Sequence, residues 1–410
     1  MLKPIGPIPP AFADQRGMLL IAGRPADAWV AEHGSPMFVY DVGVVREKVA
    51  RFRAAMPAGV RLHYAVKANP FVPLVQAIAP LVDGLDVASA GELAEVLTFK
   101  PGVAISFAGP GKRDAELEAA VCAGVTLNVE SENEAARAIA TGERIGVAPR
   151  LAVRVNPDLE LRGSGMKMGG RASPFGVDAE RVPALVRAIV ASGAEWRGFH
   201  IFAGSQALDT DALIETQAAT VALAERLAVE SGQAPPMVNL GGGFGIPHFA
   251  GDTPVDVARI GAALGETLGR RGAILAGTAF AIELGRWLVG EAGVYLTRIV
   301  DRKESRGETF LVVDGGLHHQ LAASGNFGTV VRRNYPVAIA GRMGEAADDA
   351  VSVVGCLCTP LDRLADGVVL PRADVGDVIA IFIAGAYGLT ASPSAFLGHP
   401  APAEVLAGAS

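Results

Sequence analysis

Three short segments of the sequence carry groups that can do chemistry together. Lys67 ends the apolar, strand-like run Val60–Val66, four glycines occupy five positions in Gly241–Gly245, and Glu283 precedes Arg286 by three residues. An amine among apolar neighbours can attack a carbonyl carbon, because burial disfavours its ammonium form. Glycine amides can converge on an anion. Taken singly, the segments are equally well explained as a surface lysine, a flexible turn and an internal salt bridge.

The order of the predicted elements shows how these segments can meet. Between about Val60 and Val289, short β-branched runs alternate with helical periodicity, as in Glu92–Phe99 and Ala212–Ser231. Eight strands predict an α/β fold with a closed (β/α)8 TIM barrel, in which the loops after the strands carry the chemistry. The three segments lie at the ends of the first, seventh and eighth strands. The predicted strands are Val60–Val66, Gly84–Ala88, Ala104–Ala108, Thr126–Glu130, Arg150–Val155, Trp196–Phe202, Met237–Leu240 and Phe280–Glu283.

The pattern changes after Val289, where strand-like runs are separated by turns and little helix. These runs are Val294–Asp301, Thr309–Val313, Ala350–Val354 and Val378–Phe382, and Gly341–Asp349 reads as a surface loop. We therefore expect a barrel at residues 41–289 and a mainly β domain at 290–410. The proline-rich segment 1–40 contains a short strand candidate, Met18–Ile21, that can pair with the β domain.

Composition limits the class of protein. The 410 residues fit one large barrel plus an accessory domain, and 50% hydrophobic with 19% charged residues excludes a disordered chain. A net charge of −7 argues against binding to nucleic acid or anionic membranes. Cys122, Cys356 and Cys358 are too few for a disulfide framework or a four-ligand zinc site, so no metal is expected. With no apolar run of membrane-spanning length and an N-terminus broken by prolines, we expect an unexported, cytoplasmic protein.

One cofactor uses all three groups. Pyridoxal phosphate is attached through a lysine amine, and a carboxylate keeps its pyridine nitrogen protonated so that the ring accepts electrons. We interpret Lys67 as the attachment point and Glu283 as the carboxylate. The phosphate is expected to bind the backbone of Gly241, Gly242, Gly243 and Gly245.

These segments also resemble motifs of a known family, the fold type III pyridoxal-phosphate decarboxylases that act on diaminopimelate, ornithine, lysine and arginine. The resemblance runs from about Phe38 to Leu406 and is highly specific in Tyr-Ala-Val-Lys-Ala-Asn at 64–69. It implies that Lys67 is the Schiff-base lysine. It also implies that Asp86, in Leu-Asp-Val-Ala-Ser, lies near the lysine and the cofactor, and that Arg154, in Val-Arg-Val-Asn-Pro, lies on the cofactor's oxygen side.

Two more barrel motifs match the family with one departure. Ser205 belongs to a Gly-Ser-Gln motif whose serine helps bind the phosphate, and Glu-Leu-Gly-Arg at 283–286 is similar to the family's Glu-Pro-Gly-Arg. The resemblance assigns Glu283 to the pyridine nitrogen and Arg286 to the phosphate or the substrate. The family's ring-stacking histidine is replaced by Phe202, and the nearest histidine is His200. A phenyl ring can still stack on the cofactor, whereas it cannot transfer a proton.

The C-terminal part carries the remaining matches. Cys358, in Cys-Thr-Pro-Leu-Asp, matches a cysteine that reaches the active site of the partner subunit, although without the resemblance it reads as a buried core thiol. Tyr387, in Gly-Ala-Tyr-Gly, matches a tyrosine near the cofactor. The resemblance therefore implies a homodimer with composite active sites. Lys67, Glu283 and Cys358 are the expected catalytic residues, and Arg286, Thr359 and Tyr387 the expected substrate contacts.

The resemblance implies that an amino acid replaces Lys67 on the cofactor and loses carbon dioxide, after which Cys358 or Lys67 returns a proton to the α-carbon. The positions that set specificity differ from those of familiar members. Thr359 replaces an acidic residue that contacts the substrate's distal ammonium, and a neutral hydroxyl cannot supply that charge. Ala322 replaces the arginine for the distal carboxylate, for which Arg332 or Arg333 can substitute.

We therefore expect an amino-acid decarboxylase of the diaminopimelate type. The sequence variants resemble a branch associated with exopolysaccharide export and with carrier-linked chemistry, so an aminoacyl group tethered to a carrier protein is an alternative substrate, as is a free amino acid of the ornithine or lysine type. A fold type III racemase, a non-catalytic pyridoxal-phosphate-binding protein and a barrel for another phosphate ester are the rival classes.

Overall fold

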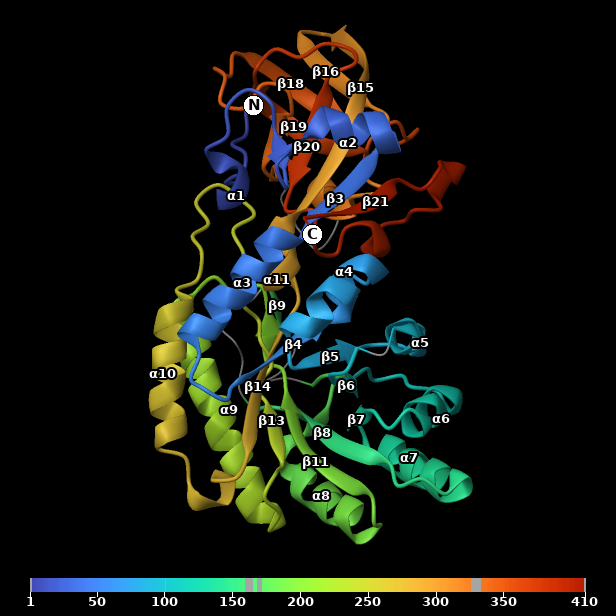
Figure 1. Ribbon diagram of the computed structural model, residues 1–410, viewed down its shortest axis with the longest axis vertical. Coiled ribbons are helices and arrows are strands. Elements are labelled where there is room, and N and C mark those ends of the chain that lie inside the picture. The colour runs from blue at the N-terminus through green and yellow to red at the C-terminus, as the bar shows by residue number, and fades with distance from the viewer. Residues whose placement is uncertain (1, 100, 159–164, 168–171, 326–332, 409–410) are drawn as a thin grey trace. The chain divides into compact units, whose positions relative to one another are not determined.

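The structure is a computed structural model that describes residues 2–99, 101–158, 165–167, 172–325 and 333–408 (Figure 1). It contains two compact units. The first, here called the barrel unit, consists of Lys48–Gly245 and Pro254–Gly285. The second, here called the β unit, consists of Met1–Glu47, Ile246–Thr253 and Arg286–Ser410. Within the described ranges, no helix is both long enough and apolar enough to cross a membrane.

The barrel predicted from the sequence is confirmed. Among the described residues, eight parallel strands follow the order β4-β5-β6-β7-β8-β11-β13-β14, and β14 pairs with β4 to close the sheet. A short strand β10 (Val177–Asp178) adds to β8. The barrel strands are β4 (Arg61–Ala65), β5 (Gly84–Val87), β6 (Ala104–Phe107), β7 (Thr126–Val129), β8 (Arg150–Asn156), β11 (Glu195–Ile201), β13 (Met237–Asn239) and β14 (Ala279–Leu284).

The barrel helices lie outside the strands, and their starts are encoded locally (Figure 1). Ser89 and Ser131, each just past a strand, cap the following helices by accepting the backbone N–H of Glu92 at 3.1 Å and of Glu134 at 3.0 Å. Such a cap stabilises a helix by about 1 kcal/mol. The helices are α3 (Val42–Ala55), which runs from the β unit into the barrel unit, α4 (Val72–Ile78), α5 (Ala90–Thr98), α6 (Asp114–Cys122), α7 (Glu132–Ile145), α8 (Val182–Ala191), α9 (Thr210–Ser231) and α10 (Val257–Gly269).

The β unit is built around β15 (Gly293–Ser305), which pairs antiparallel with β3, β16 and β20. All four predicted strands are present, and Gly341–Asp349 is largely irregular, as expected. The other strands of this sheet are β3 (Met37–Asp41), β16 (Glu308–Val313), β17 (Val337–Ile339), β18 (Asp349–Val354), β19 (Arg363–Leu370), β20 (Val378–Phe382) and β21 (Ala403–Ala407). Its helices are α1 (Pro10–Ala13), α2 (Ala26–His33) and α11 (Arg286–Val289).

The N-terminal strand candidate Met18–Ile21 is only partly a strand. β1 (Leu20–Ile21) pairs with β2 (Arg24–Pro25) in a two-stranded sheet of its own. The neighbouring Leu19 donates its backbone N–H to the carbonyl oxygen of Ala340 at 2.6 Å, in the same β unit.

Candidate active site

Lys67 and Glu283 come from neighbouring strands of the barrel. Lys67 lies in a single turn of 3-10 helix, Val66–Ala68, directly after β4, and Glu283 is the last residue but one of β14. Gly285 lets the two chain segments approach, because a Cβ there would lie 2.8 Å from the Cβ of Ala68. Parallel strands place their carboxyl ends at the same rim, so both side chains belong to the rim where barrels carry their chemistry.

A buried hydrogen bond joins His200, in β11, to Glu283. The Nε2 atom of His200 lies 2.9 Å from Oε2 of Glu283, and both side chains are almost fully buried. Burial alone would raise the pKa of Glu283. The hydrogen bond from His200, with the charges of His200, Lys67 and Arg154, outweighs burial and lowers that pKa to about 2. Glu283 is therefore a fixed negative charge at neutral pH.

Phe202 lies just past the end of β11, two residues from His200, and it faces the lysine. The Nζ atom of Lys67 lies 5.8 Å from the centre of the Phe202 ring. The ring is half-buried, whereas His200 is buried. In the barrel unit, the Phe202 ring therefore lies beside the Lys67 amine, while the His200 imidazole hydrogen bonds the Glu283 carboxylate.

Asp86, at the end of β5, is held by side chains from the strands on either side. Its Oδ1 atom accepts the Ser106 hydroxyl and lies 3.2 Å from Nδ1 of His63, while Asn128 donates to Ser106 at 3.2 Å. Burial opposes the charging of His63, but the charge of Asp86 and its hydrogen bond prevail and raise the pKa of His63. Gly84 accommodates the imidazole, since a Cβ there would lie 2.6 Å from Nε2 of His63. His63, Ser106 and Asn128 were missed in the sequence.

Arg154, in β8, forms a buried ion pair with Glu130, which the sequence analysis also missed. The Nη1 atom of Arg154 donates to Oε1 of Glu130 at 2.8 Å, and the guanidinium lies 5.0 Å from the centre of the Phe175 ring. Glu130 also accepts the backbone N–H groups of Gly109 at 2.6 Å and Gly176 at 3.1 Å. Arg154 is therefore fixed on one side by protein groups.

The glycine segment after β13 needs its glycines for space. A Cβ at Gly241 would lie 2.6 Å from the Ile201 carbonyl oxygen, and one at Gly242 would lie 1.8 Å from the Glu283 carbonyl oxygen. Gly241 and Gly243 have φ values of +69° and +83°, which side chains disfavour.

The backbone N–H groups of this glycine segment differ in whether they already donate a hydrogen bond within the protein. The N–H of Gly241 donates to the Asn239 side chain at 2.9 Å, and that of Gly245 donates to the Ala207 carbonyl oxygen at 2.8 Å. Within the described residues, the N–H groups of Gly242 and Gly243 have no protein acceptor. These two amides are therefore the ones that an anion can use.

Ser205 lies in a short strand, β12 (Gly204–Ser205). This strand pairs antiparallel with β9 (Met166–Lys167), and Ser205 is half-buried.

The remaining predicted residues belong to the β unit. The guanidinium of Arg286 lies 4.7 Å from the centre of the Tyr387 ring, and its buried Nε atom has no hydrogen-bond partner within the described ranges. Tyr387 has a φ of +52°, a conformation that is costly for a side chain and concentrates at functional sites.

The positions predicted to set specificity are also in the β unit. Cys358 is exposed rather than a core thiol, and Thr359 is half-buried with its Oγ1 accepting the Leu361 backbone N–H at 3.4 Å. Ala322 is buried in the short turn Leu321–Ser324. Arg333 packs on the Phe249 ring at 3.9 Å. Arg332 lies outside the described residues.

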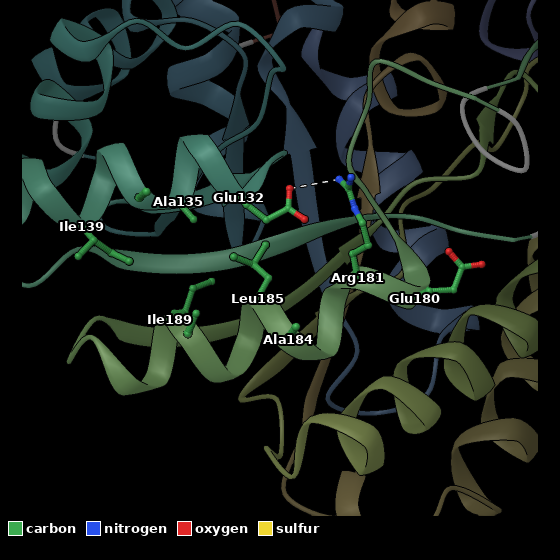
Figure 2. A pocket seen from close by; sticks show the side chains of 10 residues that line it. Glu132, Ala135, Ile139, Glu180, Arg181, Ala184, Leu185 and Ile189 are labelled. Carbon is green, nitrogen blue, oxygen red and sulfur yellow. Dashed lines mark hydrogen bonds and ion pairs between the residues drawn. The ribbon is translucent and has the colours of Figure 1, made fainter.

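A separate groove lies on the outside of the barrel between α7 and α8. Figure 2 shows it bridged by the ion pair between Glu132 and Arg181, at 3.1 Å, and lined by aliphatic side chains such as Ile139 and Leu185. The predicted site residues are not among its lining residues.

The rim cluster of the barrel unit fits a cofactor with an anionic tail and a basic ring nitrogen. The atoms Nδ1 of His200, Oδ2 of Asp86 and Nε2 of His63 are buried without a hydrogen-bond partner in the described part of the chain. Buried polar atoms normally have partners, so such atoms beside Glu283 and at the end of β5 indicate a bound group. A closed barrel with an amine, a fixed carboxylate and vacant glycine amides at its rim defines a pyridoxal-phosphate-binding protein.

The chain belongs to the pyridoxal-dependent decarboxylases, because the family model described as "Pyridoxal-dependent decarboxylase, pyridoxal binding domain" matches residues 42–290. It is 35% identical, over 91% of its length and 88% of the relative, to an L-glutamyl-(BtrI acyl-carrier protein) decarboxylase of Niallia circulans. It is 32% identical to the diaminopimelate decarboxylase of Archaeoglobus fulgidus, over 96% and 93% of the two chains.

Solved structures agree with this assignment. The crystal structure of diaminopimelate decarboxylase from Helicobacter pylori, complexed with L-lysine, is 25% identical and superposes with a TM-score of 0.80 over 93% of each chain. These similarities confirm the fold, the cofactor and the class expected from the sequence. The protein is a pyridoxal-phosphate-dependent amino-acid decarboxylase.

Proposed function

We propose that the substrate of this decarboxylase is an aminoacyl group tethered to a carrier protein. The observation that carries this proposal is the absence of a usable acid in the segment Cys356–Asp362, where Thr359 replaces the acidic residue that the resemblance calls for. Asp362 is 3% exposed, and its two carboxylate oxygens accept the backbone N–H groups of Leu317 and Leu357. A site without a free carboxylate suits an acyl chain that ends in a thioester rather than in an ammonium group.

The relatives support both this substrate and its alternative. The relative that is 35% identical is named for a glutamyl group on an acyl-carrier protein, whereas the relative that is 32% identical is named for diaminopimelate. Free diaminopimelate is therefore the second candidate, and it would need a cation near Ala322 for its distal carboxylate.

The rim residues have the following proposed roles. Lys67 supplies the amine that attaches the cofactor and, with Cys358, is the candidate for returning a proton to the α-carbon. Glu283 holds a proton on the ring nitrogen, and Phe202 covers one face of the ring. When bound, pyridoxal phosphate supplies the electron-accepting ring that stabilises the electron pair left by carbon dioxide.

The other predicted residues hold the cofactor or the substrate in place. His200 keeps Glu283 ionised, and Gly242 and Gly243 donate to the phosphate. Asp86, Arg154, Ser205, Gly241, Gly245 and Tyr387 complete the proposed cofactor site, and Arg286, Thr359 and Tyr387 the proposed substrate site.

We also propose a cytoplasmic homodimer with composite active sites. The support is that Cys358 and Tyr387, which the family resemblance assigns to the active site, lie in the β unit, and that Cys358 is exposed. Analytical ultracentrifugation tests the dimer. Mixing Lys67→Ala and Cys358→Ala chains tests the shared site, because subunits that exchange residues should restore about a quarter of the wild-type activity.

A substrate panel tests the substrate proposal. Carbon dioxide release is measured with meso-diaminopimelate, L-ornithine, L-lysine, free L-glutamate and L-glutamyl groups on an acyl-carrier protein. Turnover of the tethered group alone supports the proposal, whereas strong turnover of free meso-diaminopimelate overturns it. Loss of chirality without carbon dioxide release would instead indicate a racemase.

A single substitution sharpens the same test. Thr359→Glu restores the missing acid and should raise kcat/KM for free diamino acids at the expense of the tethered substrate. Thr253→Glu is the matched control, since Thr253 is an exposed threonine far in sequence from the proposed site residues of the β unit. Equal profiles for the two variants would contradict the role given to Thr359.

Attachment of the cofactor is tested separately. Borohydride reduction followed by peptide mapping should place a phosphopyridoxyl group on Lys67. Its appearance on another lysine, or on none, would refute the assignment of Lys67.

A further inference from the structure

Three potential metal ligands that have no role in the proposed decarboxylation site meet in the β unit. One ligand atom from each of His318, Cys356 and His399 lies within 4.8 Å of the other two. The Sγ atom of Cys356 lies 3.9 Å from Nδ1 of His399, and the rings of His318 and His399 have their centres 5.2 Å apart. Zn–S and Zn–N bonds of about 2.3 and 2.0 Å place tetrahedral ligands about 3.5 Å apart, so this spacing is close to that of a zinc site.

His318 provides a second, independent observation. Its side chain is fully buried, yet within the described residues neither Nδ1 nor Nε2 has a hydrogen-bond partner. A buried imidazole with two unpartnered nitrogens is rare unless water or an ion binds it.

Asp362 fixes the two segments that carry His318 and Cys356. Its Oδ1 atom accepts the N–H of Leu317 at 2.7 Å, and Oδ2 accepts that of Leu357 at 2.9 Å, so the carboxylate binds the residue next to each ligand. Gly316 and Gly355 make room for it, since a Cβ at either position would lie within 2.5 Å of an Asp362 oxygen.

His319 fixes the third segment. Its Nε2 atom donates to the Pro400 carbonyl oxygen at 3.2 Å, which leaves Nδ1 to accept the Tyr295 hydroxyl at 3.1 Å. Pro400 directly follows His399, and the His319 ring packs on His318 with centres 3.7 Å apart. His319 is therefore committed to positioning, and all three ligand segments are held before any ion binds.

We propose that His318, Cys356 and His399 bind a divalent transition-metal ion of the zinc class. Two imidazoles and one thiolate are ligands that Zn²⁺ prefers, and three protein ligands leave a fourth position for water or a substrate atom. Cys356 and His399 are half-buried, so the site can be reached from solvent. The small number of cysteines excludes a four-cysteine site but not this one.

Cobalt binding tests the site in the full-length, cofactor-loaded protein. One equivalent of Co²⁺ per chain should give the visible bands of a tetrahedral ion and a sulfur-to-cobalt charge-transfer band, which pyridoxal phosphate cannot produce. Zn²⁺ should displace the cobalt. Absence of stoichiometric binding, or binding without the sulfur band, overturns the proposal.

Matched variants identify the ligands. Cys356→Ser should abolish the charge-transfer band, and His318→Ala and His399→Ala should each weaken Zn²⁺ binding by more than the ~10–100-fold that loss of a supporting residue costs. Cys122→Ser and Cys358→Ser should leave the band unchanged. A band that survives Cys356→Ser, or that is lost in Cys358→Ser, refutes the assignment.

Protection of the Cys356 thiol by bound Zn²⁺ can be measured on the wild-type protein, so this test does not require any variant to fold. In the wild-type protein, Zn²⁺ should slow the alkylation of Cys356 by iodoacetamide at least tenfold, as measured by peptide mass spectrometry, and leave that of Cys122 unchanged. Equal alkylation rates of Cys356 with and without Zn²⁺ would also overturn the proposal.

Discussion

The hydrogen bond between His200 and Glu283 should couple the two side chains strongly, and its strength can be measured without substrate or cofactor. His200→Leu and Glu283→Leu each remove the titratable group and its side of the hydrogen bond. The double variant completes the cycle, which isolates the interaction from the separate effects of the two substitutions.

The expected magnitude follows from the charge that Glu283 carries. Its ordinary value of 4.5 falls to about 2 in the folded protein, although burial acts in the opposite direction. Among the groups that lower this pKa, His200 acts most strongly, through its hydrogen bond and its charge. Because a hydrogen bond to a charged group is worth about 1.5–3 kcal/mol, the pair should be coupled by about that much. Because the folded pKa is the lower one, this stabilisation is complete above pH 4.5 and is lost as the pH falls toward 2.

Urea unfolding of the cofactor-free chains at pH 7 measures the coupling. Far-UV circular dichroism reports the barrel unit, because α5 to α10 belong to it. We expect a coupling energy of about 1.5–3 kcal/mol, the value of a hydrogen bond to a charged group. The exposed pair Arg259–Asp211, at 2.6 Å, is the control and should give less than ~1 kcal/mol. A His200–Glu283 coupling no larger than that of the control pair would refute the reasoning.

Three further outcomes are expected. Gly242→Ala places a Cβ 1.8 Å from a strand carbonyl oxygen, so bound pyridoxal phosphate, measured by its absorbance, should be lost, whereas Gly277→Ala, with open space around it, should retain it. Burial lowers the pKa of His248 from 6.5 to about 3, so below pH 6.5 the unfolded chain binds a proton that the folded protein does not. The free energy of unfolding, and with it the Tm, should therefore decrease as the pH falls below 6.5, by up to about 1.4 kcal/mol per pH unit from this residue. His248→Gln should remove that contribution. Lys112→Met leaves the buried Glu134 unpaired and should cost about 3–5 kcal/mol by thermal unfolding, most of it recovered by adding Glu134→Leu.

Much of the fold follows from local pattern, and the rest depends on distant pairing. The barrel strands were predictable because each is a short β-branched run between amphipathic helices. β3 and β21 were missed because they pair with each other although more than 360 residues separate them, as the register Met37↔Ala403 shows. β19 was missed because Asp366 and Gly367 interrupt its apolar pattern, and pairing with β18 overrides that local preference.

The residues of the candidate site likewise fall into those that the sequence predicts and those that only the fold brings together. Lys67, Glu283 and the glycine segment were predictable because the chemistry of a barrel is restricted to the ends of its strands. Nothing in the sequence pairs His200 with Glu283, which is 83 residues away. Ser106 could have been found, since it occupies on β6 the position that Asp86 occupies on β5, and adjacent parallel strands bring such residues together.

Phe202 stands where the family resemblance expects a histidine. In the proposed site, one residue therefore stacks on the cofactor, Phe202, and another sets the pKa of Glu283, His200. An imidazole at this position would place a second titratable ring beside Lys67, whose Nζ atom lies 5.8 Å from the centre of the Phe202 ring. A phenyl ring covers the cofactor without adding charge or a hydrogen-bond donor. Glu283 keeps its hydrogen bond with His200, which lowers its pKa, and is proposed to hold the ring nitrogen. Phe202→His should therefore retain the cofactor and shift the pH dependence of kcat, and an unchanged pH profile would show that a titratable ring at this position does not affect the reaction.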